Sequence, residues 1–227
     1  HRFQTHDAPA YFLSFVPDPF RLSPSALPHD TVHLRSSFDD RATDTHVKPY
    51  DRLRNDETMA SLLEEFGRVS VEPVESGEEF RRLVVSITNQ SVSTESARAV
   101  RGRLFDALNE VTPRSVLDTP PEELAETGIG EAKAEYLREA ARAFETNDYT
   151  RDAFAEASNA EVRDTLTEIR GVGEWTANMY LIFALGREDV LPLGDLAVRR
   201  GIECLYGVET REEMRRVAED WKPYRSY

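Results

Sequence analysis

Cysteine is nearly absent from this chain of 227 residues. Its one cysteine, Cys204, excludes an internal disulfide framework and any iron–sulfur cluster or zinc site that needs several cysteines of one chain. We expect Cys204 in the core. No run of about 18 apolar residues occurs, so no transmembrane helix is expected. The first residues lack the basic and apolar stretches of a secretory signal, which with the lone cysteine favours a cytoplasmic protein.

Lysine is also scarce, because it supplies only three of the 28 basic residues. Against 42 acidic residues, the net charge is −14. An acid excess with few lysines is typical of proteins from salt-loving organisms, since carboxylate-rich surfaces stay hydrated and molar salt shortens the Debye length to about 3 Å. An ordinary acidic cytosolic protein has a similar balance. Taken alone, this charge argues against nucleic acid as a partner.

Residues 1–58 differ in composition from the rest. They hold all five histidines and six of the twelve prolines, and they show no sustained period of 2 or 3.6. We therefore predict an irregular or disordered leader over 1–58 and a folded domain over 59–227, starting at the first methionine, Met59. No metal site is predicted, because the histidines lack the spacing of metal ligands: His1, His6, His29, His33 and His46.

Helical periodicity dominates from residue 59 onward. Apolar residues recur at i, i+3, i+4 and i+7 in 80–87, and a similar stripe runs through 137–144. The predicted fold class is all-α, a helical bundle joined by short turns. Val69-Ser70-Val71 is the one strand-like trace. Further helices are expected at 59–66, after Ser93, and at 120–124, 162–169, 175–185 and 212–221.

A Gly-x-Gly pattern occurs twice between predicted helices, at Gly128-Ile-Gly130 and at Gly171-Val-Gly173. The second pattern leads directly into a helix N-terminus, where free N–H groups and the helix dipole attract a phosphate. Glycine leaves no Cβ in the way of such a ligand. Main-chain donors of this kind would let an acidic protein bind DNA. A sharp corner between two helices that binds nothing fits the spacing equally well.

Asp195 follows Pro192 and Gly194 at the expected start of another helix. It is a favoured residue for capping that helix. A carboxylate at a rigid helix end is also suited to point into a cleft and stabilise positive charge. Both roles are compatible, and the pattern does not separate them.

Several motifs in order resemble the helix-hairpin-helix (HhH-GPD) DNA glycosylase superfamily, most closely its 3-methyladenine DNA glycosylase II branch. Gly-Val-Gly-Glu-Trp-Thr-Ala at 171–177 and Leu-Pro-x-x-Asp-Leu-x-Val-Arg-Arg-Gly at 191–201 are similar to the signature that ends in the catalytic aspartate. Residues 80–94 resemble the family helix that ends in a Gln-x-x-Ser loop. Residues 127–137 resemble its middle helical turn, and 221–227 the start of its closing helix. The resemblance covers about 61–227.

The resemblance implies base excision repair of double-stranded DNA that contains damaged bases. The enzyme would flip out an alkylated, 3-methyladenine-like base and hydrolyse its N-glycosidic bond. By motif position, Asp195 is the catalytic residue and Trp175 and Met179 line the base pocket. The remaining site residues are assigned to the DNA backbone (Gly171, Gly173 and Thr176) and to an intercalating loop (Gln90 and Ser91).

Trp175 stands where bifunctional glycosylase/lyases of this superfamily carry a lysine that forms a Schiff base. The resemblance therefore implies a monofunctional glycosylase. Two alternatives remain open, a non-catalytic helix-hairpin-helix DNA-binding protein and a bifunctional glycosylase/lyase.

The resemblance also bears on cofactors and on the end of the chain. No cofactor or iron–sulfur cluster is expected, while the hairpin carbonyls are a candidate site for a monovalent cation. The protein is expected to be a monomer near the nucleoid, with no membrane partner. Ser91 is small for a wedge, Met179 replaces an aromatic residue of some relatives, and the chain ends at Tyr227, where the closing helix is expected to begin.

Overall fold

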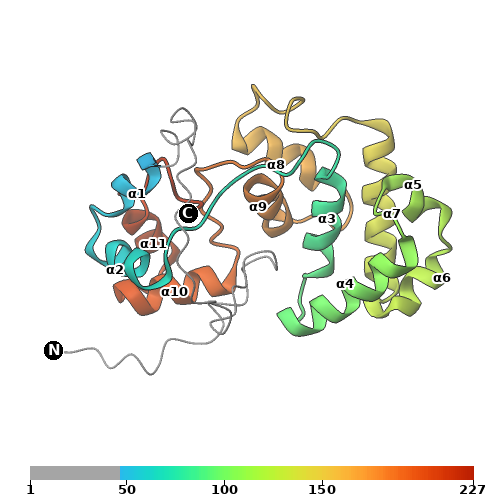
Figure 1. The fold of residues 1–227 in the computed structure, drawn as a ribbon, viewed down its shortest axis with the longest axis horizontal. Helices are drawn as coiled ribbons and strands as arrows, with labels where there is room; N and C mark the ends of the chain where they lie inside the picture. Colours follow the sequence, from blue (N-terminus) through green and yellow to red (C-terminus); the bar gives the residue numbers. More distant parts are fainter. Residues whose placement is uncertain (1–46) are drawn as a thin grey trace, which may run out of the picture.

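The computed structural model describes residues 47–227, and this part of the chain is helical without a single strand. The predicted all-α class is confirmed. In Figure 1, α1, α2, α10 and α11 gather at one end and α3 to α9 at the other. The elements are α1 Val47–Leu53, α2 Glu57–Phe66, α3 Glu79–Thr88, α4 Thr94–Leu108, α5 Pro113–Asp118, α6 Pro121–Leu124, the π-helical turn η3 Ala125–Ile129, α7 Glu131–Thr146, α8 Asn159–Thr167, α9 Glu174–Phe183, α10 Leu196–Tyr206 and α11 Arg211–Val217.

Regular structure begins before the predicted boundary at Met59. Helix α1 lies within the segment expected to be irregular, and its Tyr50 and Leu53 side chains are buried. Helix α2 then begins at Glu57, because Oδ1 of Asp56 accepts hydrogen bonds from the backbone N–H groups of Thr58 and Met59. A helix of two turns is too short to show a period in the sequence. The predicted leader up to residue 46, with all five histidines, lies outside the described residues.

The strand-like trace at Val69–Val71 forms no strand. It lies in an extended segment between α2 and α3, and the Val69 carbonyl accepts a hydrogen bond from the Tyr50 hydroxyl instead of from a neighbouring strand. No helix among residues 47–227 is long and apolar enough to cross a membrane.

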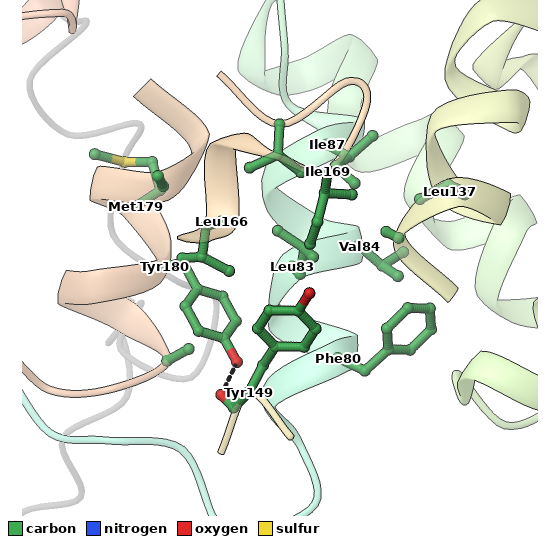
Figure 2. Close-up of a cluster of buried hydrophobic side chains, with 14 of the residues drawn as sticks. Phe80, Leu83, Val84, Ile87, Leu137, Tyr149, Leu166, Ile169, Met179 and Tyr180 are labelled. Carbon is green, nitrogen blue, oxygen red and sulfur yellow. Dashed lines mark hydrogen bonds between the residues drawn. The ribbon is translucent and has the colours of Figure 1, made fainter. Parts of the chain in front are cut away.

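The larger hydrophobic cluster forms the centre of the α3–α9 part. The predicted stripe of α3 packs there against α7, α8 and α9 (Figure 2). Tyr180 of α9 is fully buried, and its hydroxyl donates a 2.8 Å hydrogen bond to the carbonyl of Tyr149, whose ring stacks on Phe144. This core fixes α8 and α9, and therefore the glycine turn between them.

A second, smaller cluster joins α1, α2, α10 and α11, with buried Leu53, Ile202, Met214 and Trp221. Cys204 of α10 lies outside it and is exposed, so the expectation that it belongs to the core is wrong. Helix α10 is amphipathic, and Cys204 falls on its solvent side.

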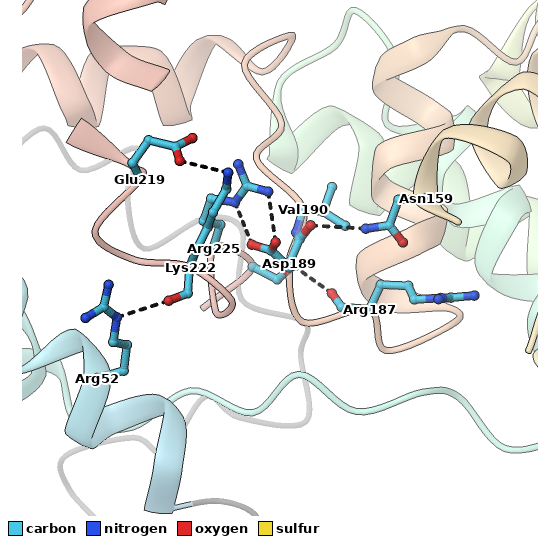
Figure 3. Close-up of polar contacts among 9 residues, drawn as sticks. Arg52, Asn159, Arg187, Asp189, Val190, Glu219, Lys222 and Arg225 are labelled. Carbon is cyan, nitrogen blue, oxygen red and sulfur yellow. Dashed lines mark hydrogen bonds and ion pairs between the residues drawn. The ribbon is translucent and has the colours of Figure 1, made fainter. Parts of the chain in front are cut away.

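The segment after α11 is made of turns and does not continue the predicted helix to residue 221. It holds the chain around Asp189 in place (Figure 3). The Arg225 guanidinium donates to both carboxylate oxygens of Asp189, at 2.5 and 2.9 Å. The Ser226 hydroxyl accepts from the Val190 N–H and donates to the Arg187 carbonyl. These contacts position the segment that leads into Asp195.

Candidate active site

Asp195 caps α10, as the sequence predicted. Its Oδ1 accepts hydrogen bonds from the N–H groups of Ala197 at 2.7 Å and Val198 at 3.2 Å. The residue is only 8% exposed, so its carboxylate is largely removed from bulk water. A buried carboxylate held at a helix N-terminus is both satisfied and rigidly oriented.

The second oxygen of Asp195 is oriented by Trp175. The indole Nε1–H donates a 2.7 Å hydrogen bond to Oδ2. Because an indole N–H is a donor only, the contact requires an acceptor oxygen opposite it. Three donors from two elements therefore fix both carboxylate oxygens of Asp195.

Asp56 offers an internal comparison with Asp195. It too is a helix cap whose Oδ1 accepts from two backbone N–H groups, and its Oδ2 accepts from an indole, that of Trp221, at 3.0 Å. At Asp56, however, Oδ2 has a second donor, the Tyr206 hydroxyl at 2.9 Å. Among the described residues, Oδ2 of Asp195 has no second donor. One acceptor position on this oxygen remains for another group.

A cavity of about 750 Å³ lies beside Asp195. It brings together seven of the eight predicted site residues, which come from the loop after α3, the glycine hairpin, the start of α9 and the start of α10. The lining residues are Asn89, Gln90, Ser91, Tyr136, Thr167, Ile169, Arg170, Gly171, Val172, Gly173, Trp175, Thr176, Gly194, Asp195 and Leu196.

Met179 does not line this cavity, in contrast to its predicted place in the base pocket. It is 4% exposed and belongs to the larger core cluster. Residue 179 lies one turn beyond Trp175 on α9, and α9 is buried continuously from Thr176 to Ile182. A helix that is buried on all sides over these residues places Met179 in the core.

The two glycines of the hairpin are needed for different reasons. Gly171 has a φ of +91°, and a Cβ there would lie 2.2 Å from the ring of Tyr136, so the fold itself requires glycine. Gly173 has a φ of −93°, and no atom lies within 4 Å of the place where its Cβ would be. Neither backbone nor packing demands glycine at 173. Its missing side chain leaves the N-terminus of α9 open to a ligand.

Gln90 connects the loop after α3 to the hairpin. Its Nε2 donates to the carbonyl of Gly171 and to the hydroxyl of Thr176, both at 2.9 Å. This amide is therefore engaged within the protein, and Thr176 is buried at 2% exposure. Ser91 differs, because it is exposed at the cavity and has a φ of +54°. Of the two predicted loop residues, only Ser91 projects to the outside.

Tyr136 is a cavity residue that the sequence reasoning did not single out, although it lies in the quoted 127–137 stretch. Its ring packs on Gly171 and lines the cavity. The Gly-x-Gly pattern alone could not identify it, because the contact joins α7 to the hairpin turn about thirty-five residues further along the chain. Leu196, next to Asp195, also lines the cavity and is 52% exposed.

No lysine lines this cavity. Lys133 of α7 lies near it, but its ammonium donates to the carbonyls of Thr88 at 2.9 Å and Gln90 at 2.6 Å, at the end of α3. Burial lowers the pKa of Lys133. Within residues 47–227, no group of three or more His, Cys, Asp or Glu side chains is arranged to hold a metal ion.

Comparison with known proteins matches residues 84–224 to the HhH-GPD superfamily of base excision DNA repair proteins. A solved Schizosaccharomyces pombe 3-methyladenine DNA glycosylase in complex with abasic DNA is 28% identical, with a TM-score of 0.69 over 79% of this chain and 91% of that one. A Bacillus halodurans DNA-3-methyladenine glycosidase structure is 29% identical, with a TM-score of 0.66 over 82% and 86%.

A curated relative, an alkylbase DNA glycosidase-like protein of S. pombe, is 25% identical over 75% of this chain and 84% of its own length. DNA-3-methyladenine glycosylase 1 of the same yeast is 31% identical over 59% of this chain and 60% of its own length. The family match spans most of the chain and includes the hairpin, Trp175 and Asp195. This chain belongs to the HhH-GPD superfamily of base excision DNA repair proteins.

Proposed function

We propose that the protein is a monofunctional DNA glycosylase that removes alkylated bases from double-stranded DNA. The observation that carries this proposal is the buried Asp195 carboxylate, which is oriented by Trp175 and borders a cavity beside the glycine hairpin. The cavity volume of about 750 Å³ lies within the range of small-molecule sites, roughly 300–1,000 Å³. The names of the relatives supply the substrate class, alkylated bases.

The chemistry follows from the two oxygens of Asp195. Once a nucleotide is flipped into the cavity, cleavage of its N-glycosidic bond develops positive charge on the sugar. A fixed carboxylate in a site with little water stabilises that charge strongly. Oδ1 is engaged by the cap of α10, so Oδ2 is the oxygen available to the sugar or to the attacking water. The water adds at the sugar carbon, its proton passes to the carboxylate or solvent, and the base leaves.

Trp175 fits an alkylated base in two ways. Its indole is half-buried at the cavity, and its bond to Asp195 fixes the orientation of the ring. A positively charged, alkylated purine is attracted to an aromatic face more strongly than a neutral base. We therefore assign to Trp175 both the orientation of the carboxylate and part of the base pocket.

The absence of a lysine from the cavity lining supports monofunctional action. A lyase needs an amine that attacks the sugar, and the nearby Lys133 ammonium already binds two carbonyl oxygens. Borohydride treatment during turnover tests this directly. We expect released base, an uncut abasic site and no trapped adduct. A covalent protein–DNA adduct would establish the bifunctional alternative.

The cap geometry of Asp195 supports the other alternative, a protein that only binds DNA. Asp195→Asn, with Asp56→Asn as the matched control, separates the two functions, because each change affects a capping carboxylate bonded to an indole. We expect Asp195→Asn to reduce base release about 100-fold or more while duplex binding persists. Asp56→Asn should release base normally below its melting temperature. Normal base release by Asp195→Asn would remove Asp195 from the catalytic role, and duplex binding without base release in the wild type and both variants would leave only a DNA-binding function.

The proposed partner is duplex DNA with damaged bases, bound by a monomer in the cytoplasm near the nucleoid. The proposed hydrolysis needs the carboxylate and a water molecule but no redox cofactor. The hairpin carbonyls remain a proposed site for a monovalent cation. Duplex affinity in KCl compared with tetramethylammonium chloride at equal ionic strength tests that site.

A further inference from the structure

A second cleft, of about 510 Å³, shares the lining residue Gly194 with the cavity. Four arginines from three parts of the chain line it: Arg163 of α8, Arg211 and Arg215 of α11, and Arg225 of the final segment. We call this the arginine cleft. Its other lining residues are Asn159, Ala160, Glu174, Asp189, Val190, Leu191, Leu193, Gly194 and Glu219.

The arginine cleft is positive although the chain is strongly acidic. Its four arginines outnumber the three lining carboxylates, whereas the whole chain carries −14. Two of these carboxylates are already neutralised, Asp189 by Arg225 and Glu219 by Lys222 at 2.8 Å (Figure 3). Glu174 is the third. The excess charge of the cleft therefore comes from Arg163, Arg211 and Arg215.

Arg211 and Arg215 have no ion pair among the described residues, and both are exposed. Arg163 makes one neutral contact, from its Nε to Asn178 at 3.0 Å. The stability of α11 does not explain Arg211, because a cation in the first turn opposes the helix dipole. Arg211 and Arg215 also lie four residues apart, where like charges repel. An anion bound between them would remove both penalties.

The place of the cleft identifies the source of that anion. Gly194 lines both the cavity and the arginine cleft, and it directly precedes Asp195. Glu174, which lines the cleft, is the first residue of α9 and follows the hairpin. A duplex with a nucleotide in the cavity passes this point with a charged phosphate every few ångströms. Guanidinium groups bind phosphate oxygens in a paired geometry, which suits an arginine-rich chain with few lysines.

We propose that the arginine cleft binds the phosphodiester backbone of DNA next to the flipped nucleotide, through Arg211 and Arg215. This inference rests on the proposed function. It gives an acidic chain a local positive field at the edge of its active site, in addition to the main-chain donors of the hairpin.

The test compares Arg211→Gln/Arg215→Gln with Arg216→Gln. Arg216 is the matched control, because it lies beside Arg215 on α11 but pairs with Glu212 and does not line the cleft. Affinity for a duplex with an uncleavable abasic analogue is measured over a series of KCl concentrations. From the net charge we expect a wild-type log–log slope of about −2 to −3, at about −0.9 per neutralised phosphate.

The log–log salt slope of the double variant should be shallower than that of the wild type by about 1.8, and Arg216→Gln should keep the wild-type slope. Shortening the duplex on one side of the analogue should reproduce the double variant, which identifies the flank that is bound. Equal slopes in all three proteins overturn the proposal. So does a double variant that loses affinity only for inorganic phosphate or a free nucleotide, because the cleft would then be a small-anion site.

A base-release assay on the wild type separates this inference from the function on which it rests. If no base is released, the proposed glycosylase activity fails, while the slopes still report whether the cleft binds DNA. If base is released and the slopes are equal, only the arginine cleft is refuted.

Discussion

The indole nitrogen of Trp175 lies 2.7 Å from Oδ2 of Asp195, and the two residues are twenty positions apart in the chain. One belongs to the first turn of α9 and the other caps α10. This bond joins the hairpin to the candidate catalytic carboxylate, so movement of either element displaces Asp195 from the cavity.

Trp175→Phe should keep the aromatic ring and remove the donor. A hydrogen bond to a charged group contributes roughly 1.5–3 kcal/mol, so we expect single-turnover base release to fall about 10-fold or more. Trp221→Phe is the control, because it removes the equivalent donor from Asp56. The control should lower stability but leave the rate on folded protein unchanged. An unaltered rate in Trp175→Phe would show that the indole N–H does not orient the carboxylate.

Alanine substitution of the two hairpin glycines should have different effects on stability and on duplex affinity. Gly171→Ala places a methyl group 2.2 Å from the Tyr136 ring at a positive φ, and we expect it to lower the free energy of unfolding by roughly 1–3 kcal/mol or more. Gly173→Ala meets no atom within 4 Å, so its unfolding free energy should change by only about 0.5 kcal/mol. Its duplex affinity should fall, because the methyl group obstructs the phosphate. Wild-type affinity in Gly173→Ala would count against phosphate binding at this turn.

Asp56 should make stability depend on pH. Burial raises the pKa of this carboxyl, but hydrogen bonds from Trp221, Met59, Tyr206 and Thr58 outweigh burial and leave the pKa below its usual value. Because the pKa is lower in the folded state, Asp56 stabilises that state at pH values above the pKa of the unfolded chain, about 3.9. This contribution is lost as the pH falls through the pKa of the folded state.

Urea unfolding of wild type and Asp56→Asn at several pH values measures this effect. The wild type should be the more stable protein at neutral pH, by an amount that stays level down to about pH 4 and then shrinks. A difference that grows on acidification would contradict the lowered pKa.

The ion pair between Arg225 and Asp189 should couple the final segment to the loop before Asp195. The pair has two hydrogen bonds, and its side chains are only 19% and 32% exposed, so salt should screen it less than the surface pairs. A double-mutant cycle with Arg225→Gln and Asp189→Asn should give a coupling free energy of about 1 kcal/mol or more. A value near zero, at low and high salt alike, would mean that the Ser226 contacts alone hold the loop.

Local patterns predicted those features that depend on neighbours in the chain. The stripe in α3 gave a helix at the right place, and Asp195 was recognised as a cap because it follows Pro192 and Gly194. The family was recognisable because its signature is a run of contiguous residues around the hairpin and Asp195, and the family match confirms it. Helix α1 was missed because its burial depends on contacts with residues far along the chain, such as the Tyr227 ring against Tyr50.

The sequence by itself determined an all-helical chain of this superfamily, with a glycine hairpin and an aspartate at a helix start. Helix caps, turns and the apolar faces of helices depend on residues that are close together in the chain. Only the tertiary structure decided which side chains meet. It brought Trp175 to Asp195, tied Gln90 to the hairpin, placed Met179 in the core and gathered arginines beside Gly194. These outcomes depend on how helices pack, and the packing angle and depth of a helix are set by all the elements around it, not by its own sequence.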